Sequence, residues 1–396
     1  MDESVVIVGA GIGGLSLALS LHARGVRVTV LERAAELREV GAAVALSANG
    51  LRPLDELGLL GELEKVAAQP TELIHRGWRD DERVSAFPVG IDGSYRRRFG
   101  APYLGIHRAE FQRVLAGACP EGMVRLDCEV TAVDPDGTVT LASGEQLRAA
   151  VVVGADGVHS RVRSVVDPDA RPRYTGTSAF RGIVDVADAP LLPDPGAIQF
   201  WMGPDAHVLH YAIGAHAEQI NFFAVLEGPE PWTGGAGPTE TDPGTLERAF
   251  AGWAPGVVQM LTAVPQSPHW PLYTLPPMTR WSRGRVVLLG DAVHTMLPHH
   301  GQGANQSIED AAVLADLLAA PGALDGDHAE AFDRYQRLRR ARTRSIQRSS
   351  LVTSGLLHLP DGPETDARNA GLAGLDPWLT WIHGVDARAD TRPVPA

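Results

Sequence analysis

The first 31 residues contain two apolar runs separated by a stretch with helical periodicity. Residues 5–8 and 26–31 are rich in valine, which is typical of buried β-strands. Between them, after a cluster of glycines, Leu15, Ala18 and Leu19 recur at the spacing of one helix face. Because parallel strands need a crossover connection, this order predicts a βαβ unit that begins a parallel sheet.

Further along, the same two periodicities alternate. Residues 149–153 form a continuous apolar run, as expected of a strand that is buried on both faces of a parallel sheet, and residues 286–289 predict another strand. Residues 130–133 and 139–141 predict a hairpin around Pro135-Asp136-Gly137. Apolar spacing predicts helices over residues 51–66, 108–118, 303–318 and 328–351.

Two segments depart from this α/β pattern. Residues 73–101 are rich in arginine, glycine and aromatic residues, and we interpret them as an excursion out of the first domain. Residues 173–280 have the alternation of antiparallel strands, with Pro- and Gly-rich joints at 189–196 and 227–244. This block predicts a separate sheet inserted into the α/β domain. After Asp386 we expect a disordered tail.

Composition excludes several classes of protein. A net charge of −13 argues against nucleic-acid binding, which depends on clustered lysine and arginine. Cys119 and Cys128, without a CxxC pair, support neither a disulfide framework nor a zinc site. The acidic start and the lack of a long apolar run argue against a signal peptide and a membrane span. We therefore expect a cytoplasmic protein, a monomer or homodimer, with small-molecule partners and neither a nucleic-acid nor a membrane partner.

The glycine cluster has the form of a dinucleotide-binding turn. Gly9, Gly11 and Gly14 satisfy GxGxxG directly after the first strand and at the start of the first helix. Glycines at these positions let the backbone approach a pyrophosphate, and the helix N-terminus favours an anion. Glu32, at the end of the second strand, is placed to meet a ribose hydroxyl. These residues leave NAD, NADP and FAD open.

Two further motifs distinguish among these cofactors. Asp156 follows the strand at 149–153 in the run Gly-Ala-Asp-Gly, and Asp291 follows the strand at 286–289 in the run Gly-Asp-Ala. An Asp at the carboxyl end of a parallel strand points into the ligand crevice, or alternatively caps its own turn. With Arg108, these motifs make the chain resemble the para-hydroxybenzoate hydroxylase family of FAD-dependent monooxygenases, in its salicylate hydroxylase-like branch. The resemblance runs from about residue 4 to 350.

The resemblance implies roles for these residues and a domain plan. Glu32 would hold the adenosine ribose, Arg108 the pyrophosphate and Asp291 the ribityl chain, while Asp156 would serve both FAD and a transient NADPH or NADH. Arg33 and Arg38 lie where the family sets nucleotide preference. The implied fold is α/β: a discontinuous Rossmann-like FAD-binding domain with a mixed parallel sheet (1–74, 103–172 and 281–325), an inserted antiparallel β-sheet substrate domain (75–102 and 173–280), and C-terminal helices with a tail (326–396).

A third glycine loop carries the most chemistry. Gly301, Gly303, Ala304 and Asn305 follow Pro298 and lead into the helix at 303–318, so their backbone amides predict an anion site. By the resemblance, this loop binds the anionic edge of reduced FAD, and the carbonyl of Pro298 steadies the flavin C4a-hydroperoxide. His294, His299 and His300 suggest a metal as an alternative, but without a cysteine or a free carboxylate nearby we expect none.

The substrate-side residues come from the inserted sheet. Strand alternation places His207, Leu209 and Tyr211 on one face and turns His210 away. By the resemblance, His207 accepts the proton of a phenol, Tyr211 orients it and Gln302 completes the polar set. The alternative is that these side chains are structural. Leu275 stands where relatives usually carry an arginine.

The predicted activity is hydroxylation of a small aromatic substrate, phenolic or acidic, with NAD(P)H and O2. One alternative is an epoxidase or Baeyer–Villiger oxygenase that acts on a larger natural product. Others are a non-oxygenating flavin oxidoreductase and a non-catalytic flavin-binding protein.

Overall fold

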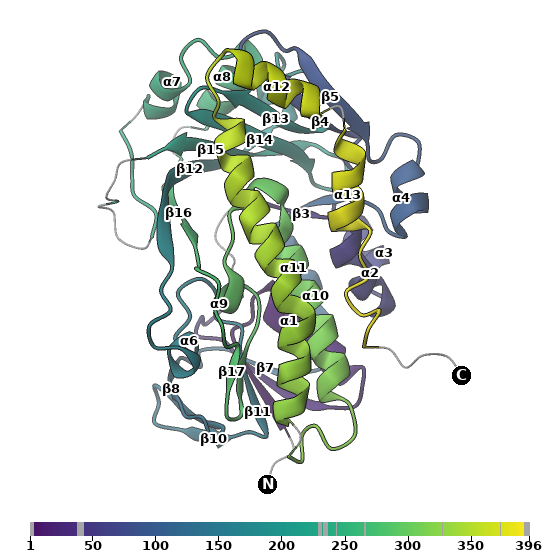
Figure 1. Ribbon diagram of the computed structural model, residues 1–396, viewed down its shortest axis with the longest axis vertical. Coiled ribbons are helices and arrows are strands. Elements are labelled where there is room, and N and C mark those ends of the chain that lie inside the picture. Colours follow the sequence, from purple (N-terminus) through teal and green to yellow (C-terminus); the bar gives the residue numbers. More distant parts are fainter. Residues whose placement is uncertain are drawn as a thin grey trace.

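Two β-sheets lie at opposite ends of the molecule, and one long helix runs between them (Figure 1). The computed structural model describes residues 4–37, 43–228, 232, 237–242, 244–264, 267–326, 328–372 and 374–391. Among these residues, no helix is long and apolar enough to cross a membrane.

The first sheet has six strands. Their spatial order is β17 (Ser282–Arg283), β18 (Val286–Leu288), β11 (Val151–Gly154), β1 (Ser4–Val8), β2 (Arg27–Leu31) and β7 (Val124–Arg125). All neighbours are parallel except β17 and β18, so the sheet is mixed. Every residue of β11 is buried between its neighbours, which agrees with the continuous apolar run in the sequence. Because these strands are parallel neighbours, the carboxyl ends of β1, β11 and β18 lie side by side.

The second sheet has seven strands. Their order is β16 (His269–Thr274), β12 (Arg173–Asp185), β15 (Gln219–Glu227), β14 (Ala206–Ile213), β13 (Ile198–Gly203), β4 (Glu72–Gly77) and β5 (Arg83–Pro88). The expectation of a purely antiparallel sheet is wrong at one pair, because β4 runs parallel to β13. The segment at 73–101 thus leaves the first sheet and joins the edge of the second.

Two small sheets complete the β structure. One contains β8 (Val130–Val133), β9 (Thr138–Leu141) and β10 (Gln146–Arg148), and it includes the predicted hairpin. The other pairs β3 (Ala43–Leu46) with β6 (Leu104–His107). Ala45 of β3 lies beside the first turn of α10, because its carbonyl accepts a hydrogen bond from Asn305.

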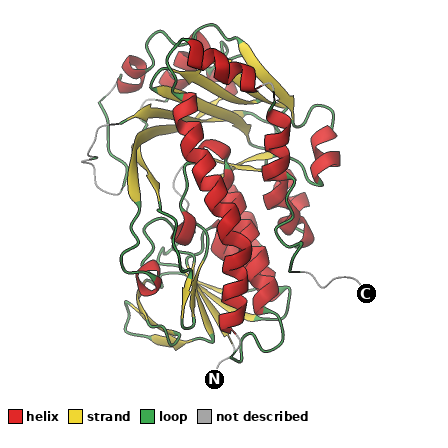
Figure 2. Cartoon of the chain, viewed as in Figure 1, coloured by secondary structure: helices red, strands yellow, loops and turns green. Residues whose placement is uncertain are grey.

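Figure 2 shows how the helices surround these sheets. They are α1 (Ile12–His22), α2 (Ala48–Glu56), α3 (Leu60–Glu64), α4 (Ser94–Phe99), α5 (Arg108–Gly117), α6 (Arg163–Val166), α7 (Thr245–Ala249), α8 (Pro255–Thr262), α9 (Asp291–His294), α10 (Gln302–Leu318), α11 (His328–Leu357), α12 (Pro363–Leu372) and α13 (Leu375–His383), with 3₁₀ turns η1 (Val186–Asp188) and η2 (Pro298–His300). One predicted helix over 51–66 is instead two, because Gly58 takes a positive φ of 74° between α2 and α3.

Helix α11 continues to Leu357, beyond the predicted end at residue 351. It packs against α10, and its far end reaches the seven-stranded sheet (Figure 1). The expectation of a disordered tail is wrong for residues 387–391, since Arg388 forms an ion pair with Asp316 at 2.6 Å. The last five residues lie outside the described part of the chain.

Candidate active site

The turn between β1 and α1 requires glycine at two positions and leaves space at a third. Gly9 has a φ of 106°, and a Cβ there would lie 2.6 Å from the carbonyl oxygen of Ala155. A Cβ on Gly14 would lie 2.0 Å from the oxygen of Gly9, so the helix packs directly on the strand. Gly11 has an ordinary backbone conformation, and a Cβ there would meet no protein atom within 4 Å.

The end of β2 is tied to this turn through Glu32. Its carboxylate accepts hydrogen bonds from the backbone amides of Ala10 and Ala34, both at 2.9 Å. Arg33 is exposed, and neither residue lines the cavity described next. Arg38 lies outside the described residues.

A cavity of about 490 Å³ lies where the strand ends meet. Its walls bring together these predicted residues: Gly11, Arg108, Tyr211, Asp291, Pro298, Gly301, Gln302, Gly303 and Ala304. Sequence reasoning missed Arg181 of β12, whose guanidinium lies 5.0 Å from the ring of Phe223 and 5.1 Å from that of Trp270. Burial and the neighbouring Arg108 lower the pKa of Arg181 to about 10, which still leaves it cationic. The cavity therefore offers two cations to an anionic ligand.

Asp156 and Asn305 hold loops in place and do not line the cavity. The carboxylate of Asp156 accepts hydrogen bonds from the backbone amides of Arg161 and Val162, as in the capping alternative. The side chain of Asn305 binds the amide of Ser47 and the carbonyl of Gly301. The carbonyl of Pro298 accepts the amide of Gly301 at 2.8 Å, which closes the turn before α10.

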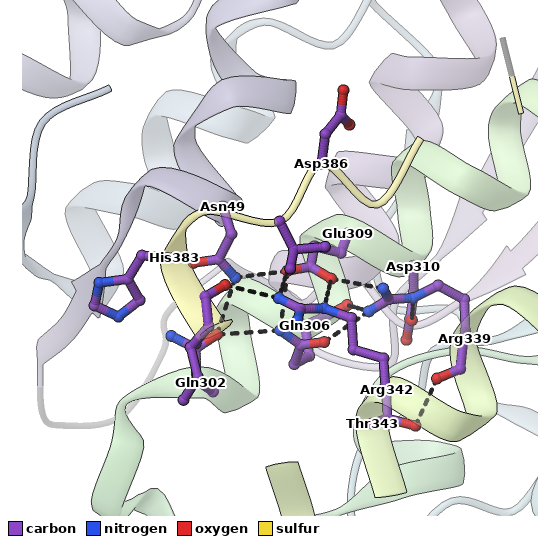
Figure 3. A network of polar contacts seen from close by, with 12 residues as sticks. Asn49, Gln302, Gln306, Glu309, Asp310, Arg339, Arg342, Thr343, His383 and Asp386 are labelled. Atoms are coloured by element: carbon purple, nitrogen blue, oxygen red, sulfur yellow. Dashed lines mark hydrogen bonds and ion pairs between the residues drawn. The ribbon is translucent and has the colours of Figure 1, made fainter. Parts of the chain in front are cut away.

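Behind the start of α10 lies a buried polar network (Figure 3). Gln302 faces the cavity, but its side chain turns to Ser47 and Asn49, both at 2.9 Å. Asn49 also binds Glu309, whose carboxylate is paired with Arg339 at 2.6 Å and Arg342 at 2.7 Å. The backbone amides at the helix start are thereby fixed toward the cavity, where the helix dipole favours an anion.

A second cavity, of about 350 Å³, adjoins the first. The two share Ala45, Leu209, Tyr211 and Gly301. Its wall is mainly apolar, with Leu73, Ile198, Phe200, Met202 and Leu209 from the seven-stranded sheet. The far wall is formed by the ends of α11, α12 and α13, which contribute Thr353, Leu356, Leu357, Arg368, Gly371, Leu372 and His383.

His299 is the unpartnered polar group of this second cavity. It is 2% exposed, lines the cavity, and neither ring nitrogen has a hydrogen-bond partner among the described residues. Burial lowers its pKa to about 3, so the ring is neutral at physiological pH. A buried polar group without a partner is costly, and a ligand group that binds it recovers that cost.

His207 lies behind His299. The strand alternation is as predicted, since Tyr211 lines both cavities while His210 turns away to accept a hydrogen bond from Trp201 at 3.1 Å. His207 itself lines neither cavity. Its ring lies 4.9 Å from that of His299, edge to face, and its Nδ1 binds His358 Nε2 at 2.7 Å.

The remaining histidines of the loop have separate partners. His294 binds Asp310 at 2.5 Å, and His300 binds Ser349 at 2.9 Å. Within the described ranges, no three histidine, cysteine or acidic side chains form a group suited to a metal ion. Leu275 is buried, lines neither cavity, and is held through its carbonyl by Gln347.

The sequence of residues 2–350 matches the FAD binding domain family. The chain belongs to this family. It is 39% identical over 389 residues to 3-amino-4-hydroxybenzoate 2-monooxygenase PtmB3 of Streptomyces platensis, covering 97% of this chain and 96% of that one. It is 33% identical over 350 residues to 6-hydroxynicotinate 3-monooxygenase of Bordetella bronchiseptica, covering 87% and 90%. A salicylate hydroxylase substrate complex superimposes with a TM-score of 0.83 at 28% identity over 99% of each chain.

The predicted family, α/β fold class and FAD cofactor are thereby confirmed, as is the enzyme class of FAD-dependent monooxygenase. The first cavity fits FAD in its chemistry. Helix starts, two cations and open space at Gly11 face one hollow, which suits a pyrophosphate and an anionic ring edge.

Substitution of Gly11 by valine tests this fit. The side chain would meet no protein atom but would enter the cavity, so we expect a folded protein that retains little FAD. Bound FAD is measured by absorbance after gel filtration. The free energy of unfolding of the FAD-free variant should lie within about 1 kcal/mol of that of the FAD-free wild type. Gly61 in α3 is a matched control with equally open surroundings, and its valine variant should keep FAD. A yellow Gly11→Val protein would contradict the assignment.

Proposed function

We propose that this enzyme uses NAD(P)H and O2 to hydroxylate a single-ring aromatic acid that carries a ring hydroxyl. Two observations support the substrate class: the small, mainly apolar second cavity, and the name of the 39% identical relative, which acts on an amino-hydroxybenzoate. A volume of about 350 Å³ is near the lower end for ligand pockets, which favours one ring over a larger natural product.

The residues proposed to hold FAD surround the first cavity or fix its walls, except Arg33, which is exposed directly after Glu32. They are Gly9, Gly11, Gly14, Glu32, Arg33, Arg108, Asp156, Asp291, Gly301, Gly303, Ala304 and Asn305. When bound there, FAD supplies the redox chemistry, accepting a hydride from NAD(P)H and allowing O2 to be split between product and water. Arg108 and the amides at the start of α10 face the negative charge of this cofactor. Pro298 closes the turn that aims those amides.

The observation that carries the proposal is that neither ring nitrogen of His299 has a hydrogen-bond partner among the described residues. We propose that the neutral His299 ring accepts a hydrogen bond from the substrate hydroxyl, which raises the electron density of the aromatic ring. His207 positions His299 from behind, by the edge contact and its bond to His358. Burial raises the pKa of Tyr211, so this phenol stays protonated and donates to the substrate. Gln302 fixes the helix start.

Replacement of His299 by alanine is expected to lower kcat/KM by about 10-fold, because a buried hydrogen bond contributes about 1–1.5 kcal/mol. FAD content should stay unchanged, because His299 does not line the first cavity. An exposed histidine, His216, provides the control, and its alanine variant should match wild type. Wild-type turnover by His299→Ala would remove His299 from the mechanism.

The activity itself is tested with a panel of hydroxylated aromatic acids under ¹⁸O2. NADH and NADPH oxidation is followed together with mass spectrometry of the product. We expect at least one acid to stimulate oxidation and to acquire one ¹⁸O atom. If no acid acquires label while the protein holds FAD, the proposal is wrong.

A further inference from the structure

Among the described residues that line the second cavity, one carries a permanent charge. Its titratable wall residues are four histidines, two tyrosines and one arginine: His75, His299, His300, His383, Tyr103, Tyr211 and Arg368. Burial lowers the pKa of the four histidines to about 4, 3, 4 and 3, in that order, and raises the pKa of both tyrosines. At physiological pH these six side chains are neutral, so among the described residues of the wall Arg368 alone carries a charge.

Arg368 is held in place but has donors to spare. From α12, its Nε and Nη2 donate to Asn369 Oδ1 at 3.0 and 2.8 Å, and its Nη1 donates to the carbonyl of Leu356 at 3.0 Å. A guanidinium has five N–H groups, so two remain. Among the described residues no carboxylate lies within ion-pair distance of Arg368, which is half-buried. Burial lowers the pKa of this arginine, and the charge of Asp361, at longer range, partly opposes that shift.

The charge of Arg368 acts inside the cavity. It contributes, after burial, to the lowered pKa of His75, another wall residue on β4. A fixed cation in a mainly apolar wall attracts an anionic group strongly, because little water screens it. The chain as a whole carries a charge of −13, so anions gain no general attraction to this protein. If the second cavity prefers an anionic ligand, a positively charged group in its wall must cause that preference.

We propose that Arg368 binds the carboxylate of the aromatic substrate and selects acids over neutral phenols. This inference rests on the proposed function and names the residue that would set its substrate class. Planar guanidinium groups match carboxylates with paired hydrogen bonds, and the two remaining donors suit this contact. The hydroxyl of the same ring would meet His299, so two substituents fix its orientation.

Arg368 lies after the part of the chain that matches the family model. The match to the FAD binding domain family ends at residue 350, whereas Arg368 lies in α12, beyond that end. Figure 1 shows α12 at the end of the molecule that holds the seven-stranded sheet. Substrate selection would thus depend on a C-terminal segment that contributes nothing to the wall of the FAD cavity.

The test compares an acid with its amide on the FAD-loaded enzyme. Calorimetry gives the Kd of 3-amino-4-hydroxybenzoate and of 3-amino-4-hydroxybenzamide for wild type, Arg368→Gln and Arg368→Lys. Truncating one partner of a buried charge pair costs about 2 kcal/mol or more, so Arg368→Gln should weaken the acid at least about 30-fold. The amide should change less than about 3-fold, and lysine should restore part of the acid's affinity.

Arg113→Gln is the matched control. Arg113 is an exposed arginine of α5 that pairs with Glu110 at 2.7 Å and lines neither cavity. Its variant should bind both ligands as wild type does. The proposal is overturned if Arg368→Gln weakens acid and amide equally, or if it leaves the acid unchanged.

The same samples separate this proposal from the proposed function. If the enzyme binds the acid more tightly than the amide through Arg368 but no product acquires ¹⁸O, the role of Arg368 stands and the proposed hydroxylation is wrong. If acid and amide bind with equal Kd values and both give labelled product, the hydroxylation stands and the role of Arg368 is wrong.

Discussion

Replacement of Arg339 by methionine is expected to lower the free energy of unfolding by about 3–5 kcal/mol. Arg339 donates to Glu309 and Asp310, each at 2.6 Å, and to Gln306 at 2.8 Å, and all four side chains are buried (Figure 3). Burial favours protonation of Glu309, yet Arg339 and Arg342 hold its pKa below the ordinary value. Removal of Arg339 leaves two buried carboxylates with one cation, Arg342, and one histidine, His294.

The measurement is urea unfolding of the FAD-loaded protein at pH 7.5. Arg340 is the next residue of α11, is exposed, and donates to the carbonyl of Thr279. Arg340→Met should therefore lose less than about 1 kcal/mol. If Arg339→Met were as stable as Arg340→Met, the network would contribute no net stability. A second expected effect is weaker FAD retention, since the network fixes the start of α10 through Gln302.

The second large effect is loss of stability in mild acid. Seven buried histidines have a lowered pKa in the folded state because of burial: His75, His207, His210, His299, His300, His358 and His383. In the unfolded chain a histidine has a pKa of about 6.5. Below that pH the unfolded chain binds more protons than the folded one. Stability therefore falls as pH falls from about 6.5 toward 4, by up to about 1.4 kcal/mol per pH unit for each histidine.

The buried acids act in the same direction but at lower pH. Although burial opposes it, His294 and Arg339 lower the pKa of Asp310 to about 2, so its contribution is lost only below about 4. Thermal unfolding is measured at pH 7.5, 6.5, 5.5 and 5.0, and the protons taken up on unfolding are measured by titration. These data show whether stability is lost in the pH range expected for the histidines. His210→Gln should reduce the uptake by about one proton, and the exposed His216→Gln should not change it. A flat profile between pH 6.5 and 5.0 would contradict the prediction.

The sequence predicted the residues of the first cavity better than those of the second. Gly11 and Asp291 each follow a strand within a few residues, and the loop at 301–304 leads into α10, so local spacing places all three at one crevice. Alternation along β14 gave the correct face for His207 and Tyr211. Alternation did not show whether each side chain reaches a cavity, because that depends on which residues pack in front of it. In β14 that neighbour is His299, from a distant loop.

Arg368 and His383 in the wall of the second cavity were missed because the wall residues meet only in the folded chain. Arg368 and His383 come from helices that carry no motif, and they face strands almost 300 residues earlier in the chain, such as β4 with His75. Arg181 was missed for a related reason: an arginine within a strand gives no signal until Phe223 and Trp270 are seen beside it. The capping role of Asp156 was considered from sequence, and only the structure shows its amide partners.

Helix α11 has a mechanical consequence. Its 30 residues form one continuous helix about 45 Å long, with Arg339 paired to α10 near the middle and Thr353 and Leu357 in the wall of the second cavity near its C-terminal end. One helix therefore links the polar network behind the first cavity to the wall of the second. We expect substitutions near its C-terminal end to change the shape of the second cavity while FAD binding stays intact.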